Sequence, residues 1–235
     1  MRFVNGFAIA AALTLCTAPA FAQGQPDAAV AVKDGGIFAK GWAGKIDAQE
    51  EKAGQVLNNA RFEEKGGTFT VRTGPAVTYW NPANTASGSY TVSATFNEPK
   101  YMNLMDHPHP YGIMIGGNDL GTATQSLLYC AAYGNGTFIV RGMGPAPFTA
   151  QATRKPEPNA AVAKAAAKNE PVKQNIAVTV TPDKVECAIN GTVVGSYNKA
   201  DLVAAGKLKS TDGVYGLRFA HNTEVTVTDF KMTKK

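Results

Sequence analysis

The chain has 235 residues, of which 44% are hydrophobic and 17% charged, and its formal net charge is +5. This length suits one large domain or two small ones and leaves ample chain to bury a core. The basic residues are scattered or gathered at Arg154–Lys173 and Lys231–Lys235 without interleaved aromatic residues, so nucleic acid is excluded as an expected partner.

The N-terminus has the three-part layout of a secretory signal peptide. Arg2 precedes an apolar stretch at Phe7–Leu15, and small residues around Ala22 form a cleavage site. The apolar stretch is shorter than the roughly 20 residues that a bilayer requires, and no other stretch could span a membrane. The residues up to Cys16 partly match the lipobox of lipoproteins, but Leu15 is bulky where a small residue is expected before the cysteine, so cleavage at Ala22 is favoured. We therefore predict that residues 1–22 are removed and that the mature protein is periplasmic or secreted.

Residues 23–34 are small, polar and unpatterned, which predicts a flexible N-terminal tail before a single domain at residues 35–235. Strands are expected in quick succession from Val56 onward, separated by glycine and proline turns. The clearest alternation in the first half is Ser89–Asn97, in which every second residue is apolar. Further strands are expected at Tyr111–Gly117 and at Leu127–Tyr133.

The alternating pattern stops at residues 142–174, which are rich in Pro, Ala and Lys. A stretch of that length without strands predicts a long loop excursion from the sheets. Within it, Asn159–Lys168 has the composition of a short exposed helix.

The stretch Gln174–Tyr197 predicts an antiparallel meander of three strands. Two alternating apolar runs are broken at Pro182-Asp183, and Asn190-Gly191 then turns the chain again. Asn-Gly between such runs is a strong hairpin signal, because both turn residues accept a positive φ. With final strands at Gly213–His221 and Val225–Met232, the chain contains about eleven or twelve short strands and no βαβ alternation. The predicted fold class is all-β, an antiparallel two-sheet β-sandwich or jelly roll.

Two cysteines remain after removal of the signal peptide, Cys130 and Cys187. Both occupy predicted core-facing strand positions, and an oxidising compartment permits a disulfide between them. Two separate buried thiols fit the same sequence, because cysteine is often buried without a partner. Both interpretations stay open.

The order of Tyr111–Gly117, Tyr129–Arg141, Ala188–Val194, Asp212–Arg218 and Val225–Phe230 resembles the concanavalin A-like, laminin-G-like jelly-roll superfamily. It is similar in particular to bacterial exported domains of the 3-keto-disaccharide hydrolase type. The resemblance covers roughly residues 35 to 233, and its motifs are turns and strand ends. It therefore implies the fold, while lectins, glucanases and other exported domains all share that fold.

Glucanases of this fold carry a Glu-x-Asp-x-x-Glu strand, and no such motif exists in this chain. The catalytic candidates are Glu186, a carboxylate on a predicted strand, and Asp119 in a loop. An exposed Glu on an outward strand face is the simpler explanation of Glu186, because Glu is rarely buried. Asn118 and Asp119 could ligate calcium, but a tight Asx turn explains both residues, so we expect no cofactor.

His107 and His109, which flank Pro108, are candidates for ligand binding. Two imidazoles could begin a zinc or copper site, which requires a third or fourth ligand. Nothing in the sequence brings His221, the remaining histidine, close to the pair. No metal site is therefore predicted.

Four more ligand-binding candidates project from predicted strands: Tyr129, Tyr133, Arg141 and Arg218. Each alternates away from its core-facing neighbours, and together they would suit stacking and hydrogen bonding to a sugar ring. The alternative is that the tyrosines pack against the 142–174 excursion and that Arg218 pairs with a carboxylate.

The sequence predicts a carbohydrate or another exported small ligand as the partner, bound on the concave face of one sheet. A hydrolase of 3-keto-disaccharides or related glycosides is the first alternative, and a structural protein of the cell envelope is the second. No oligomeric state is predicted.

Overall fold

The computed structural model describes residue 1 and residues 28–235. The predicted signal peptide and the start of the predicted tail, residues 2–27, lie outside the described residues. Within the described part of the chain, no helix is long and apolar enough to cross a membrane.

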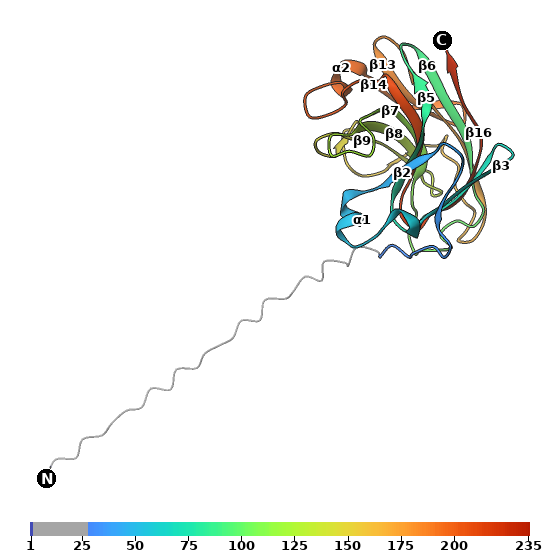
Figure 1. Ribbon diagram of the computed structural model, residues 1–235, viewed down its shortest axis with the longest axis vertical. Helices are drawn as coiled ribbons and strands as arrows, with labels where there is room; N and C mark the ends of the chain where they lie inside the picture. Colours follow the sequence, from blue (N-terminus) through green and yellow to red (C-terminus); the bar gives the residue numbers. More distant parts are fainter. Residues whose placement is uncertain (2–27) are drawn as a thin grey trace.

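Two β-sheets pack face to face as a sandwich (Figure 1). The first, sheet A, has the order β1 (Gly36–Phe38), β3 (Arg61–Lys65), β4 (Thr68–Arg72), β16 (Glu224–Lys234), β6 (Tyr90–Glu98), β12 (Val172–Val180), β13 (Lys184–Ile189) and β14 (Thr192–Asn198). The second, sheet B, has the order β10 (Phe148–Thr149), β9 (Thr137–Met143), β8 (Ser126–Ala132), β7 (Tyr111–Asn118), β15 (Gly213–Phe219), β5 (Val77–Ala86) and β2 (Ala43–Ile46), and β11 (Glu157–Pro158) also pairs with β9.

Among residues 28–235, helical structure is limited to three short segments, α1 (Ala48–Lys52), η1 (Leu57–Asn59) and α2 (Lys199–Leu202). Helix α1 lies at the edge of the sandwich below β2 in Figure 1. In the described part of the chain, every strand pair is antiparallel except β1 with β3. The predicted all-β, two-sheet sandwich is confirmed.

The predicted meander is β12, β13 and β14, paired in sequence order. The inward residues of β12, Ile176, Val178 and Val180, are at most 1% exposed. Asn190 and Gly191 have φ values of 50° and 83°, the backbone conformation expected for the turn between β13 and β14. The period of two in the sequence therefore determines which face of the meander enters the core.

The core between the sheets is rich in aromatic residues. Phe62 of β3 stacks on Tyr79 of β5 with ring centroids 4.3 Å apart, which joins sheet A to sheet B. Trp42, just before β2, lies 5.0 Å from Phe62 and 4.9 Å from Phe69 between ring centroids. Large rings in tilted and stacked contacts contribute both buried area and specific geometry to such a core.

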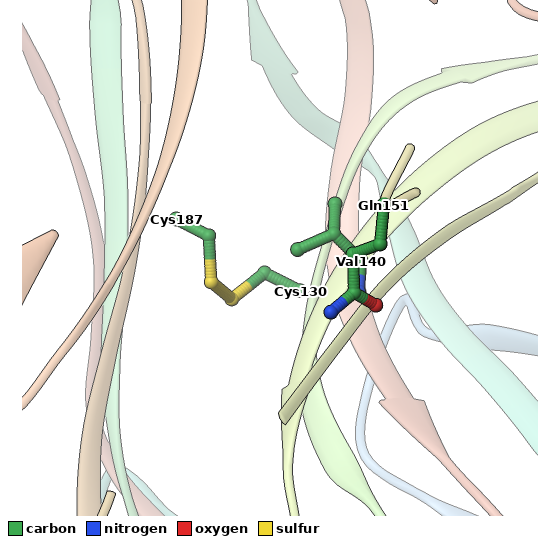
Figure 2. The surroundings of a disulfide bond; sticks show 4 residues. All are labelled: Cys130, Val140, Gln151 and Cys187. Carbon is green, nitrogen blue, oxygen red and sulfur yellow. A yellow bond between two sulfur atoms is a disulfide. The ribbon is translucent and has the colours of Figure 1, made fainter. Parts of the chain in front are cut away.

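In the structure Cys130 of β8 and Cys187 of β13 form a disulfide that links the two sheets through the core (Figure 2). Their Cα atoms are 5.9 Å apart, and both residues are at most 2% exposed. Val140 of β9 is paired with Cys130, and its backbone N–H donates to Gln151 Oε1 at 2.9 Å. The side chain of Gln151 thus ties the 142–174 excursion to the strand beside the disulfide.

The 142–174 excursion is more ordered than the sequence predicts. The short strands β10 and β11 pair with β9, and the excursion ends where β12 begins at Val172. The predicted helix at Asn159–Lys168 is wrong, because Val162 and Ala165 are buried and Lys164 forms an isolated β-bridge with Asn135. Tertiary burial overrides the helix propensity of an alanine-rich stretch here.

Candidate functional site

The face of sheet B that points away from the core is also apolar. In β8, Leu128, Cys130 and Ala132 enter the core, whereas the alternate residues Tyr129 and Ala131 are buried on the opposite face. There they pack in a second cluster with Trp80, Met114, Leu127 and Ile139. A strand buried on both faces implies that other segments cover sheet B.

A pocket of about 600 Å³ opens over this outward face. Its walls come from the strands β8, β9 and β15, from α1 and the residues around it, and from the segment before β1. The lining residues are Ala28, Ala29, Asp47, Gln49, Glu50, Ala53, Gln55, Ala76, Pro110, Tyr129, Ala131, Tyr133, Ile139, Arg141, Arg218, Ala220 and His221. The volume lies in the range of sites for small ligands.

Arg218 of β15 contributes a buried charge to the pocket. Its guanidinium donates to both carboxylate oxygens of Asp47, at 2.6 and 2.5 Å, and to Thr78 Oγ1 at 3.3 Å. Burial alone would lower the pKa of Arg218, but the carboxylate of Asp47 more than offsets this and keeps the pKa above its usual value. The bidentate pair fixes the guanidinium plane. The Cζ atom of Arg218 lies 5.4 Å from the ring centroid of Tyr129.

Tyr133 and Arg141 add an aromatic ring and a second guanidinium. Burial raises the pKa of Tyr133 to about 12, against the opposing effect of nearby Arg141, so its hydroxyl is protonated at neutral pH. Arg141 also donates to the backbone carbonyl of Arg154 in the excursion. The alternative for this group holds for Arg218, which pairs with the carboxylate of Asp47. It is Arg141, not one of the tyrosines, that donates a hydrogen bond to the excursion. All four predicted residues nevertheless line the pocket.

Three histidines lie beside one another, and one of them, His221, lines the pocket. His109 Nε2 is 2.9 Å from His107 Nε2 and 3.0 Å from His221 Nε2. The other ring nitrogen of His221, Nδ1, is 3.3 Å from Glu50 Oε1. Nothing in the sequence indicates that His221 lies near the other two, but the loop after β15 meets the loop before β7, where the Ala220 N–H donates to the Pro110 carbonyl at 3.0 Å.

The segment before β1 closes another side of the pocket. Val30 N–H donates to Asn222 Oδ1 at 2.8 Å, and Gln55 Nε2 donates to the Ala29 carbonyl at 3.2 Å. Residues 28–34 belong to the predicted flexible tail, but hydrogen bonds hold its described part against the folded domain.

No protein-family model matches the sequence, and no curated protein matches it. Among solved structures, the carbohydrate-binding module CBM66 from Bacillus subtilis matches with a TM-score of 0.53 at 8% identity, over 83% of this chain and 96% of that chain. A Bacillus subtilis protein of unknown function with a galectin-like fold gives a TM-score of 0.54 at 13% identity, over 82% and 89%. The chain has the concanavalin A-like jelly-roll fold. The narrower resemblance to 3-keto-disaccharide hydrolase-type domains stays a prediction.

The two predicted catalytic carboxylates of the jelly roll lie outside the pocket. Glu186 is on β13 of sheet A, where Ser196 Oγ donates to it at 3.4 Å. Asp119 has a φ of 51° in a tight turn and pairs with Lys209. Neither residue meets the tyrosines and arginines of sheet B, and the turn geometry at Asp119 accounts for it without calcium.

Two acidic residues of the pocket, Asp47 and Glu50, were not predicted as site residues. Asp47 directly precedes α1 and Glu50 lies within it. Their partners, Arg218 and His221, are each 171 residues away in the chain. Near-continuous apolar sequence in β7 and β8 is the signal that could have located the pocket, since it indicates cover on both faces of the sheet.

Glu98, at the end of β6, is a buried carboxyl away from the pocket. Burial raises its pKa to about 7, although a hydrogen bond from the Met102 N–H partly opposes this. The unfolded chain releases this proton near its ordinary pKa of 4.5, so between about pH 4.5 and 7 the folded state binds more protons. The free energy of unfolding is therefore expected to fall as the pH rises from about 4.5 to about 7, by at most roughly 3 kcal/mol.

Urea unfolding at pH 4.5 and pH 8 tests this prediction on the mature protein and its Glu98→Gln variant. The variant should lose most of the difference in unfolding free energy between the two pH values, whereas Glu170→Gln, an exposed control, should keep it. An unchanged difference in Glu98→Gln would show that another group carries the pH dependence.

Proposed function

We propose that the chain is an exported carbohydrate-binding module whose ligand occupies the pocket over sheet B. The observation that carries the proposal is the joint lining of one pocket of about 600 Å³ by Tyr133, Arg141 and the Arg218–Asp47 pair over an apolar floor.

The chemistry of the lining matches the chemistry of a sugar ring. A pyranose has apolar C–H faces, which pack on aromatic and aliphatic side chains, and a rim of hydroxyls that donate and accept hydrogen bonds. Tyr129, Ala131 and Ile139 provide the apolar floor. Guanidinium, carboxylate and phenol groups at the margin provide both donors and acceptors, which fix orientation.

The geometry is also organised before a ligand binds. Asp47 holds Arg218 by two hydrogen bonds, and Glu50 contacts His221, so these side chains need little further ordering. Prior ordering lowers the entropic cost of binding.

The structural likeness supports the same proposal at the level of the fold, since one of the similar structures is a carbohydrate-binding module. Export is supported by the predicted signal peptide and by the Cys130–Cys187 disulfide, which is typical of oxidising compartments. We propose the periplasm or the cell exterior as its location.

A glycan array probed with the mature chain tests the proposal, followed by calorimetric titration of the tightest saccharide. Tyr133→Ala and Arg141→Ala are each expected to weaken binding by about 10-fold or more, because aromatic and arginine contacts carry most of such binding energy. Tyr133→Phe should keep most of the affinity if ring contact dominates.

Arg72→Ala is the matched control, since Arg72 is exposed on β4 of sheet A and does not line the pocket. It should bind like the parent chain. Failure to bind any saccharide on the array, or equal losses in Arg72→Ala and Arg141→Ala, would overturn the proposal.

A further inference from the structure

We propose that His107, His109 and His221 form a binding site for a divalent transition metal such as zinc. In this site Glu50 does not bind the metal but contacts the ligand His221. The proposal goes beyond saccharide binding and does not depend on it. It rests on the convergence of three imidazole nitrogens from two loops far apart in the chain.

The distances suit a shared cation. The Nε2 atom of His109 lies 2.9 Å from that of His107 and 3.0 Å from that of His221, and the three residues offer ligand atoms within 4.8 Å of one another. Nitrogens bound tetrahedrally to zinc at about 2.0–2.1 Å lie about 3.3 Å apart. The two distances between His109 Nε2 and its neighbours are within a few tenths of an ångström of that spacing.

The chemistry of the ring nitrogens favours the same conclusion. An imidazole nitrogen carries either one proton or one lone pair. At His109 Nε2, that single proton or lone pair has to serve two neighbouring nitrogens at once. A cation between the rings removes this conflict, because each imidazole then directs one lone pair at the metal.

Histidine ligands of metals commonly contact a carboxylate through the ring nitrogen that does not bind the metal, and Glu50 provides this contact for His221. Its Oε1 lies 3.3 Å from His221 Nδ1 and also accepts the backbone N–H of Ala76 at 3.3 Å. A carboxylate at Nδ1 holds the proton there and leaves Nε2 free to ligate. Glu50 is anchored at both contacts, so the orientation of the His221 ring is set by the fold.

The loops that carry the ligands are held together by the backbone. His107 and His109 lie in the segment between β6 and β7, where Pro108 and Pro110 restrict the chain, and the Pro110 carbonyl accepts the Ala220 N–H. His221 follows directly after Ala220.

Imidazole ligands select zinc, copper, nickel or cobalt over magnesium and calcium. Three protein ligands also leave a coordination position for water or a ligand oxygen. Because His221 and Glu50 line the pocket, that position would adjoin the space proposed for the saccharide.

Zinc titration of the untagged, chelator-treated mature protein tests the site by calorimetry and by elemental analysis of the dialysed complex. The expected result is one zinc per chain. His109→Ala and His221→Ala should each weaken zinc binding at least 100-fold, and Glu50→Gln should weaken it by about 10- to 100-fold.

Glu51→Gln is the matched control, because Glu51 neighbours Glu50 on α1 and pairs with Lys45 instead. It should bind zinc like the parent protein. Thermal unfolding in chelator should be nearly unchanged in the histidine variants, which separates lost ligation from lost folding. Absence of zinc binding, or a zinc affinity unaffected in His109→Ala, would overturn the proposal. Saccharide binding measured in chelator tests the proposed function independently of the metal site.

Discussion

Replacing Arg218 with alanine is expected to lower the free energy of unfolding by about 3 kcal/mol, measured by urea unfolding at pH 7. The arginine is 6% exposed, and its loss leaves the Asp47 carboxylate without either guanidinium hydrogen bond. Removing one partner of a buried pair typically costs about 3–5 kcal/mol. The lower end applies because the Asp47 side chain is 27% exposed and can be partly hydrated.

The double variant Arg218→Met with Asp47→Leu should recover part of that loss, because it removes both charges while keeping apolar volume. Arg218→Lys should not restore full stability, since lysine cannot make the bidentate contact. A loss below about 1 kcal/mol in Arg218→Ala, comparable to that of an exposed surface arginine, would show that the pair does not organise the pocket floor.

Removing the disulfide is expected to have a similarly large effect. Cys130 and Cys187 are 57 residues apart in sequence, and closing a loop of that length restricts the unfolded chain by about 4 kcal/mol. The double variant Cys130→Ala with Cys187→Ala should therefore unfold at a markedly lower urea concentration, with a similar dependence on denaturant.

A thiol titration provides the control for this prediction. The predicted mature chain contains these two cysteines alone, so the unfolded, unreduced protein should show no free thiol and the reduced protein should show both. Free thiols before reduction, or a loss of less than about 1 kcal/mol in the double variant, would contradict the account of the cross-link.

The sequence pattern predicts the strands well wherever one face is buried. In Ser89–Asn97 and in the meander, alternation sets both the face and the register, and Asn190-Gly191 sets the turn. At Asn159–Lys168 local composition favours a helix, but the burial of Val162 and Ala165 decides otherwise. Local propensity is a weak prior against tertiary contacts of that kind.

The site is only half visible in the sequence. The alternation of β8, β9 and β15 places Tyr129, Arg141 and Arg218 on one face, and Tyr133 follows directly after β8. The contacts of Arg218 with Asp47 and of His221 with Glu50 do not follow from the alternation, because each pair is 171 residues apart in the chain. Such pairings depend on how loops meet at the end of the sandwich, and a single sequence carries no periodic signal for them.

The most direct test of the central claim is a crystal structure of the mature chain with the tightest saccharide from the array. The account predicts the sugar in the pocket over sheet B, with its ring against Tyr133 and hydroxyls within hydrogen-bonding distance of Arg141 or Arg218. A saccharide bound on sheet A, with the pocket unchanged, would contradict the account.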